Sequence, residues 1–153
     1  MTPRFLAVVA LLLTSGLIPA AASAQNPGFE AADNPFQREY DYQVGDDLRP
    51  GVQVEGLNWY LINISPRDPG DVRPGRSVTT DIHLGFENTT GETLNAVAVI
   101  LFEDAQGNGL DRAEIDDIRI PAGDSKVIKQ KEKLQSDLLL ATRRLYVFWE
   151  VQS

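Results

Sequence analysis

The chain has 153 residues, a formal net charge of −8, 42% hydrophobic residues, one histidine and no cysteine. The lack of cysteine excludes a disulfide framework, a thiolate zinc site and a cysteine nucleophile. The acidic charge argues against nucleic acid or an anionic membrane surface as a partner, because both select clustered lysine or arginine. The length suits one domain with its own core, and the apolar content is too high for a wholly disordered chain.

The N-terminus has the pattern of a secretory signal peptide. Arg4 is the only charge before residue 30, an apolar run from Phe5 to Leu13 follows it, and Ala22-Ser23-Ala24 has the spacing of a cleavage site. The apolar run is shorter than the roughly 20 residues needed to span a bilayer. Export is therefore expected, with no membrane insertion after cleavage.

This pattern predicts three segments: a signal peptide over residues 1–24, a flexible leader over 25–35 and a folded domain over 36–153. An exported protein without disulfides is ordinary for bacteria. The expected location is therefore the periplasm or the exterior of a bacterial cell.

Alternation of apolar and polar residues predicts strands through the first half of the domain. Residues Phe36 to Val44 read as a half-buried strand. Residues Val52 to Ile64 are apolar on both faces, and Gly56 in the middle suggests a bulge or a change of face. Two Pro-Gly turns then predict a surface loop from Pro66 to Arg76. The strictest alternation runs from Ser77 to Glu87 and predicts the clearest strand.

The second half continues in short strands. Leu94 to Phe102 is apolar on both faces and is expected to be a central strand. The later elements are a hairpin connection at Asp104–Gly109, two short strands near Leu110–Arg112 and Ile115–Ile120, a strand at Val127–Leu134, a short helical turn within Gln135–Thr142 and a closing strand at Leu145–Val151. About eight short strands with closely spaced turns predict an all-β fold, a single antiparallel immunoglobulin-like β-sandwich.

The middle of the domain carries a family resemblance. Gly85-Phe86-Glu87-Asn88-Thr89-Thr90-Gly91 is followed by Leu94, Val97-Ala98-Val99, the segment from Asp104 to Asn108, and Pro121-Ala122-Gly123-Asp124. This pattern over residues 77–124 resembles the FxLYD-type and related immunoglobulin-like domains of bacterial envelope proteins. The resemblance implies a small β-sandwich and no known activity.

Two patterns raise the possibility of metal binding or catalysis. Asp104, Gln106 and Asn108 have the spacing of the first oxygen ligands of a calcium loop, but Ile115 stands where the twelfth position requires Glu. A plain hairpin is the favoured interpretation, with a calcium-stabilised adhesion module as an alternative. A metal-dependent hydrolase built from Asp104, Asp116, Asp117 and His83 is a second alternative, although no hydrolase motif accompanies these residues. We expect a non-catalytic protein without a cofactor.

Candidate partner contacts are basic or aromatic. All four lysines lie close together, and three share one parity; they are Lys126, Lys129, Lys131 and Lys133. They form either a contact stripe for an acidic partner or an edge strand protected by charge. Trp59, Tyr60 and Trp149 are the aromatic candidates, because adjacent aromatic residues place one ring on each face of a strand.

These observations predict an exported binding or structural accessory module that acts through surface contacts. The expected partner is an envelope or extracellular protein or a polysaccharide, and a carbohydrate-binding module is one alternative form of this function. The contact surface is expected on the lysine strand or on the loop from Pro66 to Arg76.

Overall fold

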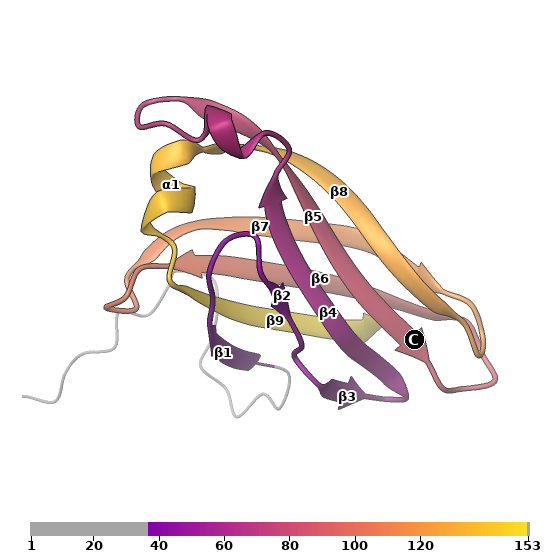
Figure 1. Ribbon diagram of the computed structural model, residues 1–153. Coiled ribbons are helices and arrows are strands. Elements are labelled where there is room, and N and C mark those ends of the chain that lie inside the picture. Colours follow the sequence, from indigo (N-terminus) through magenta and orange to yellow (C-terminus); the bar gives the residue numbers. More distant parts are fainter. Residues whose placement is uncertain (1–36, 153) are drawn as a thin grey trace, which may run out of the picture.

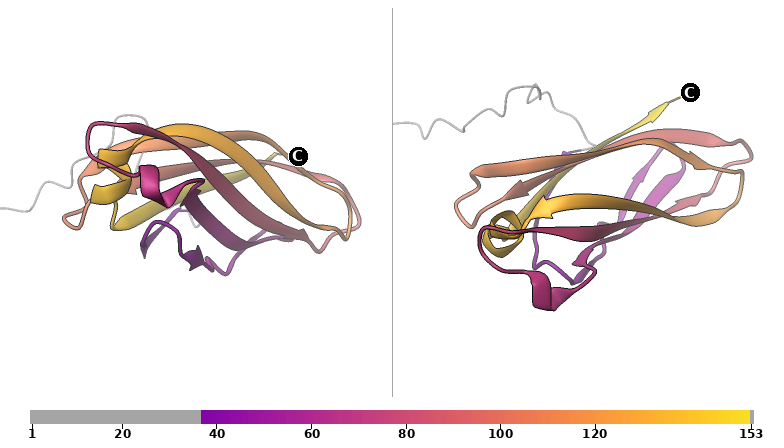
Figure 2. Two further views of the ribbon diagram at one scale, coloured as in Figure 1. Left: turned by 45° about the horizontal axis from the view of Figure 1, so that its top comes forward. Right: turned by 90° about the horizontal axis from the view of Figure 1, so that it is seen from above.

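The computed structural model describes residues 37–152 and contains two antiparallel sheets packed face to face, as Figures 1 and 2 show. In spatial order, sheet A consists of β1 (Gln37–Asp41), β9 (Arg144–Gln152), β6 (Leu94–Glu103) and β7 (Gly109–Ile120). Sheet B consists of β2 (Asp47–Leu48) and β3 (Val52–Val54), both paired with β4 (Leu57–Pro66), followed by β5 (Ser77–Asn88) and β8 (Ser125–Gln135). The predicted antiparallel β-sandwich is confirmed.

Two short helical segments lie at one end of the sandwich. A 3-10 turn, η1 (Pro69–Asp71), falls within the predicted surface loop, and α1 (Ser136–Ala141) falls within the predicted helical turn. Figure 1 shows both at the same end as the turn between β6 and β7. We call this the α1 end. No helix within residues 37–152 has the length and apolarity required to cross a membrane. The expected signal peptide, the whole of the expected leader and the first residue of the expected domain, Phe36, lie outside the described residues.

The segment from Val52 to Ile64 differs from the expectation of one strand. Glu55 and Gly56 have φ angles of 48° and 82°, so they form a tight turn that separates β3 from β4. The bulge lies instead between Trp59 and Leu61, where the register with β5 shifts. Because the bulge adds one residue to β4, odd-numbered side chains of this strand face the core before the bulge and even-numbered side chains face it afterwards. The segment is therefore apolar at both odd and even positions.

The two short strands expected after the hairpin are one continuous strand, β7. Its pairing with β6 shifts between the partners of Ala96 and Ala98. Asp117, with a φ of 55°, lies in that irregularity. The expected gap at Ala113 and Glu114 is paired with β6, and the Asp116-Asp117 pair marks a bulge within the second of the two expected strands.

The core lies between the sheets and contains an aromatic cluster. Trp59 and Phe86 from sheet B stack with ring centroids 5.2 Å apart. Trp149 from sheet A lies 5.8 Å from Trp59 and 6.2 Å from Phe86. All three are 0–1% exposed. Trp59 and Trp149 are therefore core residues, and their sequence-based assignment to a partner-contact surface is wrong.

Tyr42 joins the end of β1 to sheet B through a buried hydroxyl. This hydroxyl accepts a hydrogen bond from the backbone N–H of Ile64 at 2.8 Å and donates to the carbonyl of Asp46 at 3.0 Å. Burial raises the pKa of Tyr42 to about 12. Because the folded-state pKa lies above the value of about 10 in the unfolded chain, the associated stability is complete below pH 10 and is lost as the pH rises towards 12.

Tyr42→Phe is expected to lower the free energy of unfolding by about 1–3 kcal/mol at pH 8, because the Ile64 N–H loses its partner. The wild-type protein should then lose part of its advantage between pH 10 and 12. Urea unfolding of both proteins at pH 8 and at pH 11 measures the difference. A difference that is the same at both pH values would contradict this account of Tyr42.

Candidate functional site

Three of the four lysines lie on the outer face of sheet B. They project from β8, an edge strand that pairs with β5 on one side. Lys129, Lys131 and Lys133 are exposed and lie opposite His83, Asp81 and Thr79 of β5. We call these three residues the lysine row. Figure 1 shows sheet B in front of sheet A, so this face is turned towards the viewer.

Lys126 belongs to a different surface. It has the opposite parity, and its Nζ lies 3.5 Å from the carbonyl oxygen of Arg119 on β7. Gln130 makes a similar contact, with its amide nitrogen 3.4 Å from the carbonyl oxygen of Glu114. Lys126 and Gln130 thus reach across to the edge of sheet A, and the lysine row consists of three residues.

The lysine row has no ion-pair partner within residues 37–152. The ion pairs there are Arg67–Asp81, Arg112–Glu114 and Arg144–Glu39. Asp81 lies directly opposite Lys131, but its two carboxylate oxygens share the N–H of the Arg67 Nε, at 3.0 and 3.3 Å. Because that carboxylate already has a cationic partner, the positive charges of the lysine row remain available to an external acid.

Tyr60 projects outward from sheet B because of the bulge in β4. The register places Trp59 opposite Phe86 and Leu61 opposite Gly85, so Tyr60 is the extra residue. Its ring lies over Gly85: a Cβ built on that glycine would be 2.5 and 2.7 Å from the ring atoms Cε2 and Cζ. The tyrosine hydroxyl reaches Ser125 on β8, with an oxygen–oxygen distance of 3.3 Å. The ring therefore crosses β5 from β4 to β8.

Gly85 is the site residue that sequence analysis missed. The sequence places it on the polar face of a regular strand and at the start of the motif that carries the family resemblance, and neither observation assigns it to a site. A glycine inside a strand often marks a close approach of another group, and this is the signal that could have identified it. Which side chain makes that approach depends on the pairing of β4 with β5 and on the bulge, and neither follows from local alternation.

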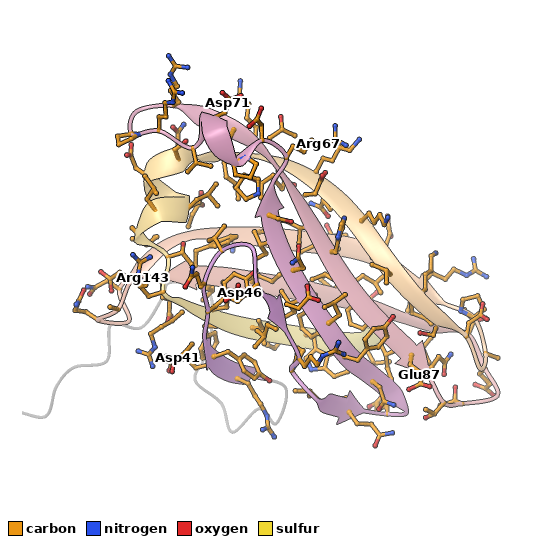
Figure 3. All side chains as sticks on the ribbon, in the orientation of Figure 1. Asp41, Asp46, Arg67, Asp71, Glu87 and Arg143 are labelled. Carbon is orange, nitrogen blue, oxygen red and sulfur yellow. The ribbon has the colours of Figure 1, made fainter. Side chains whose placement is uncertain are left out.

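The predicted contact loop from Pro66 to Arg76 borders a pocket of about 620 Å³ at the α1 end. Its apolar lining comes from three segments and consists of Val44, Pro66, Pro69, Val72, Leu139 and Leu140. Arg143 also lines it, and its guanidinium donates to the carbonyl oxygens of Leu140 and Thr142 at 2.8 and 2.6 Å. Figure 3 shows Arg143 and Asp46 at this end of the molecule, with Asp71 on the loop above. The loop also adjoins the lysine row, because Arg67 pairs with Asp81 and its backbone N–H donates to the carbonyl of Thr79.

Asp104 closes the hairpin between β6 and β7. Its Oδ1 accepts hydrogen bonds from the backbone N–H groups of Gln106 and Asn108 at 2.8 and 2.9 Å, and its Oδ2 accepts from the Asn108 amide at 2.9 Å. Hydrogen bonds from Asn108 are the main cause that lowers the pKa of Asp104. These contacts are those of an Asx turn, so the local geometry accounts for the pattern that resembles a calcium loop.

The four residues of the hydrolase alternative belong to different surfaces. His83 lies on the outer face of sheet B, Asp104 in the β6–β7 hairpin, and Asp116 and Asp117 in β7 of sheet A. Among residues 37–152 no group of three or more histidine, aspartate or glutamate side chains has the geometry to hold a metal ion. This part of the structure therefore supplies no convergent set for metal-assisted hydrolysis.

A scan of the chain against protein-family models finds no match, and a search of curated proteins finds no similar sequence. The strongest candidate site is therefore identified from its side chains alone. It is the outer face of sheet B, which combines the lysine row with the outward ring of Tyr60.

Proposed function

We propose that the chain is an exported, non-catalytic binding module of the bacterial envelope, with an immunoglobulin-like β-sandwich as its scaffold. Its contact surface is the outer face of sheet B. The observation that carries this proposal is the lysine row, three like charges on one face of a strand with no ion-pair partner within the described residues. Side chains on one face of a strand repeat about every 6.8 Å, so the charges match an extended acidic partner.

Protection of an edge strand is the competing explanation of the same lysines. It requires only that charge prevents β8 from pairing with a second chain. The two explanations differ in what neutral substitution does. If the lysines serve binding, their loss removes a contact while the protein stays monomeric; if they protect the edge, their loss promotes self-association.

Site-specific photo-crosslinking in the native host tests the contact surface. A photoreactive residue at Thr79, which is exposed beside Lys133, is expected to give an adduct of higher mass in living cells. The same residue at Asn95, exposed on sheet A, is the matched control and should give none. Lys131→Gln should reduce the Thr79 adduct. Equal adducts from both positions, or increased self-association of the Lys131→Gln variant without loss of the adduct, would contradict the proposal.

Export is tested separately by cell fractionation. The mature protein is expected outside the cytosol and cleaved after Ala24. Recovery of the uncleaved chain from the cytosol would contradict this part of the proposal.

A further inference from the structure

Tyr60 and the lysine row together specify the chemistry of a ligand. We propose that the outer face of sheet B binds an acidic polysaccharide, with one sugar ring packed on Tyr60 and successive carboxylates along Lys129, Lys131 and Lys133. This proposal rests on the proposed function and deepens it by naming the class of partner.

The first element of the site is a supported aromatic surface. One side of the Tyr60 ring lies against Gly85, and the hydroxyl is held at 3.3 Å from the Ser125 hydroxyl. The ring remains partly exposed, so its accessible surface is turned away from the sheet. The C–H groups on the face of a pyranose are apolar enough to pack on such a ring, while its hydroxyls stay in water or bond to neighbouring polar groups.

The second element is the alignment of that ring with the positive charges. The tyrosine hydroxyl reaches β8 at Ser125, and the next outward residue, Val127, is 37% exposed. The lysine row continues the same line along β8 towards the α1 end. From Val127 to Lys133 the strand spans about 20 Å at a rise of about 3.4 Å per residue. An aromatic contact followed by evenly spaced cations fits an extended polymer that carries one acid group on many of its sugars.

The direction of the side chains favours a polysaccharide over an acidic peptide. A peptide that extended sheet B would pair with the backbone edge of β8, in the plane of the sheet. Residues Lys129, Lys131 and Lys133 project instead from the face, together with the Tyr60 ring over Gly85. A ligand that contacts both must therefore lie across the face, and a stacked ring is a feature of sugar recognition that an acidic strand does not need.

Isothermal titration calorimetry with defined polymers tests the proposal. The probes are polygalacturonate, alginate and hyaluronate, all carboxylated, and fully methyl-esterified polygalacturonate as a neutral control with the same backbone. At least one carboxylated polymer is expected to bind, more weakly as salt increases, and the methyl ester to bind at least about tenfold more weakly. Failure of all three carboxylated polymers to bind would overturn the proposal, as would equal binding of the methyl ester.

Variants of the two elements separate the alternatives. Tyr60→Leu and Lys131→Gln are each expected to weaken binding about tenfold, whereas Tyr60→Phe, which keeps the ring, should stay within about threefold of the wild type. Gly85→Ala should also weaken binding, because its Cβ would displace the ring. Unfolding midpoints show that each variant is folded. If Lys131→Gln weakens polymer binding but Tyr60→Leu does not, the proposal of a polysaccharide ligand is overturned, while the proposed basic contact surface stands. Failure of the crosslinking test would instead contradict the contact surface itself.

Discussion

Replacing Trp59 with alanine is expected to lower the free energy of unfolding by about 3–5 kcal/mol, as for other large buried aromatic residues. Trp59 is 0% exposed and contacts two other rings of the cluster, Phe86 and Trp149. Removal of the indole leaves a cavity that the surrounding strands cannot fill, because both sheets are fixed by their hydrogen bonds. Urea denaturation followed by far-ultraviolet circular dichroism measures the loss.

The two buried tryptophans provide a sharper comparison. The Trp59 indole N–H donates to the carbonyl of Leu61 at 2.9 Å, whereas the indole nitrogen of Trp149 has no hydrogen-bond partner among residues 37–152. Trp59→Phe and Trp149→Phe remove similar volume, but only the first breaks a hydrogen bond. We therefore expect Trp59→Phe to be the more destabilising by about 1 kcal/mol. Equal losses of unfolding free energy for Trp59→Phe and Trp149→Phe would contradict the described core. A loss below about 1 kcal/mol for Trp59→Ala would contradict it as well.

Asn88→Ala is expected to destabilise the protein by about 2–4 kcal/mol, because it leaves several backbone groups without partners. Asn88 is 1% exposed. Its amide nitrogen donates to the carbonyls of Glu92, Ile120 and Pro121 at 2.7, 3.0 and 3.1 Å. Its Oδ1 accepts from the backbone N–H and the hydroxyl of Thr90. One side chain thus joins the end of β5, the following loop and the end of β7.

Asn88→Asp tests the donor role at almost constant volume. A carboxylate at this position would face three carbonyl oxygens and could donate to none of them. Its folded-state pKa should therefore be raised above the unfolded value of about 3.9, so the variant should regain stability relative to wild type as the pH falls towards that value. Urea midpoints of both proteins at pH 7 and pH 4.5 provide the measurement. A difference between variant and wild type that does not change with pH would contradict the proposed contacts.

The most accurately predicted strands are those in which each face is either buried or exposed along most of its length. Ser77 to Glu87 alternates, with Thr80 as the one polar residue on the inward face, and β5 covers the same segment with one further residue. Leu94 to Phe102 is apolar on both faces because β6 is central in sheet A, where even the outward Val99 and Leu101 are 6% exposed. Burial pattern and strand position correspond directly in both cases.

The incorrect predictions concern features that depend on how one strand pairs with or contacts another. Gly56 was expected to mark a bulge or a change of face, but the bulge is at Tyr60, and only the pairing with β5 reveals it. Ala113 and Glu114, where the sequence suggested a break, pair with β6, and the irregularity of β7 lies instead at Asp117, which has a positive φ. Parity correctly grouped three of the lysines, but it could not show that Lys126 would contact β7. These features depend on neighbours distant in sequence, so no local window contains them.

The most direct test of the central claim is to map ligand contacts residue by residue. Amide chemical shifts of the purified protein should be measured during titration with the carboxylated polymer that binds best. The account predicts that the largest changes fall on outward residues of β5 and β8, from Gly85 and Val127 towards Lys133. Changes centred on the pocket at the α1 end, or spread evenly over both sheets, would contradict it.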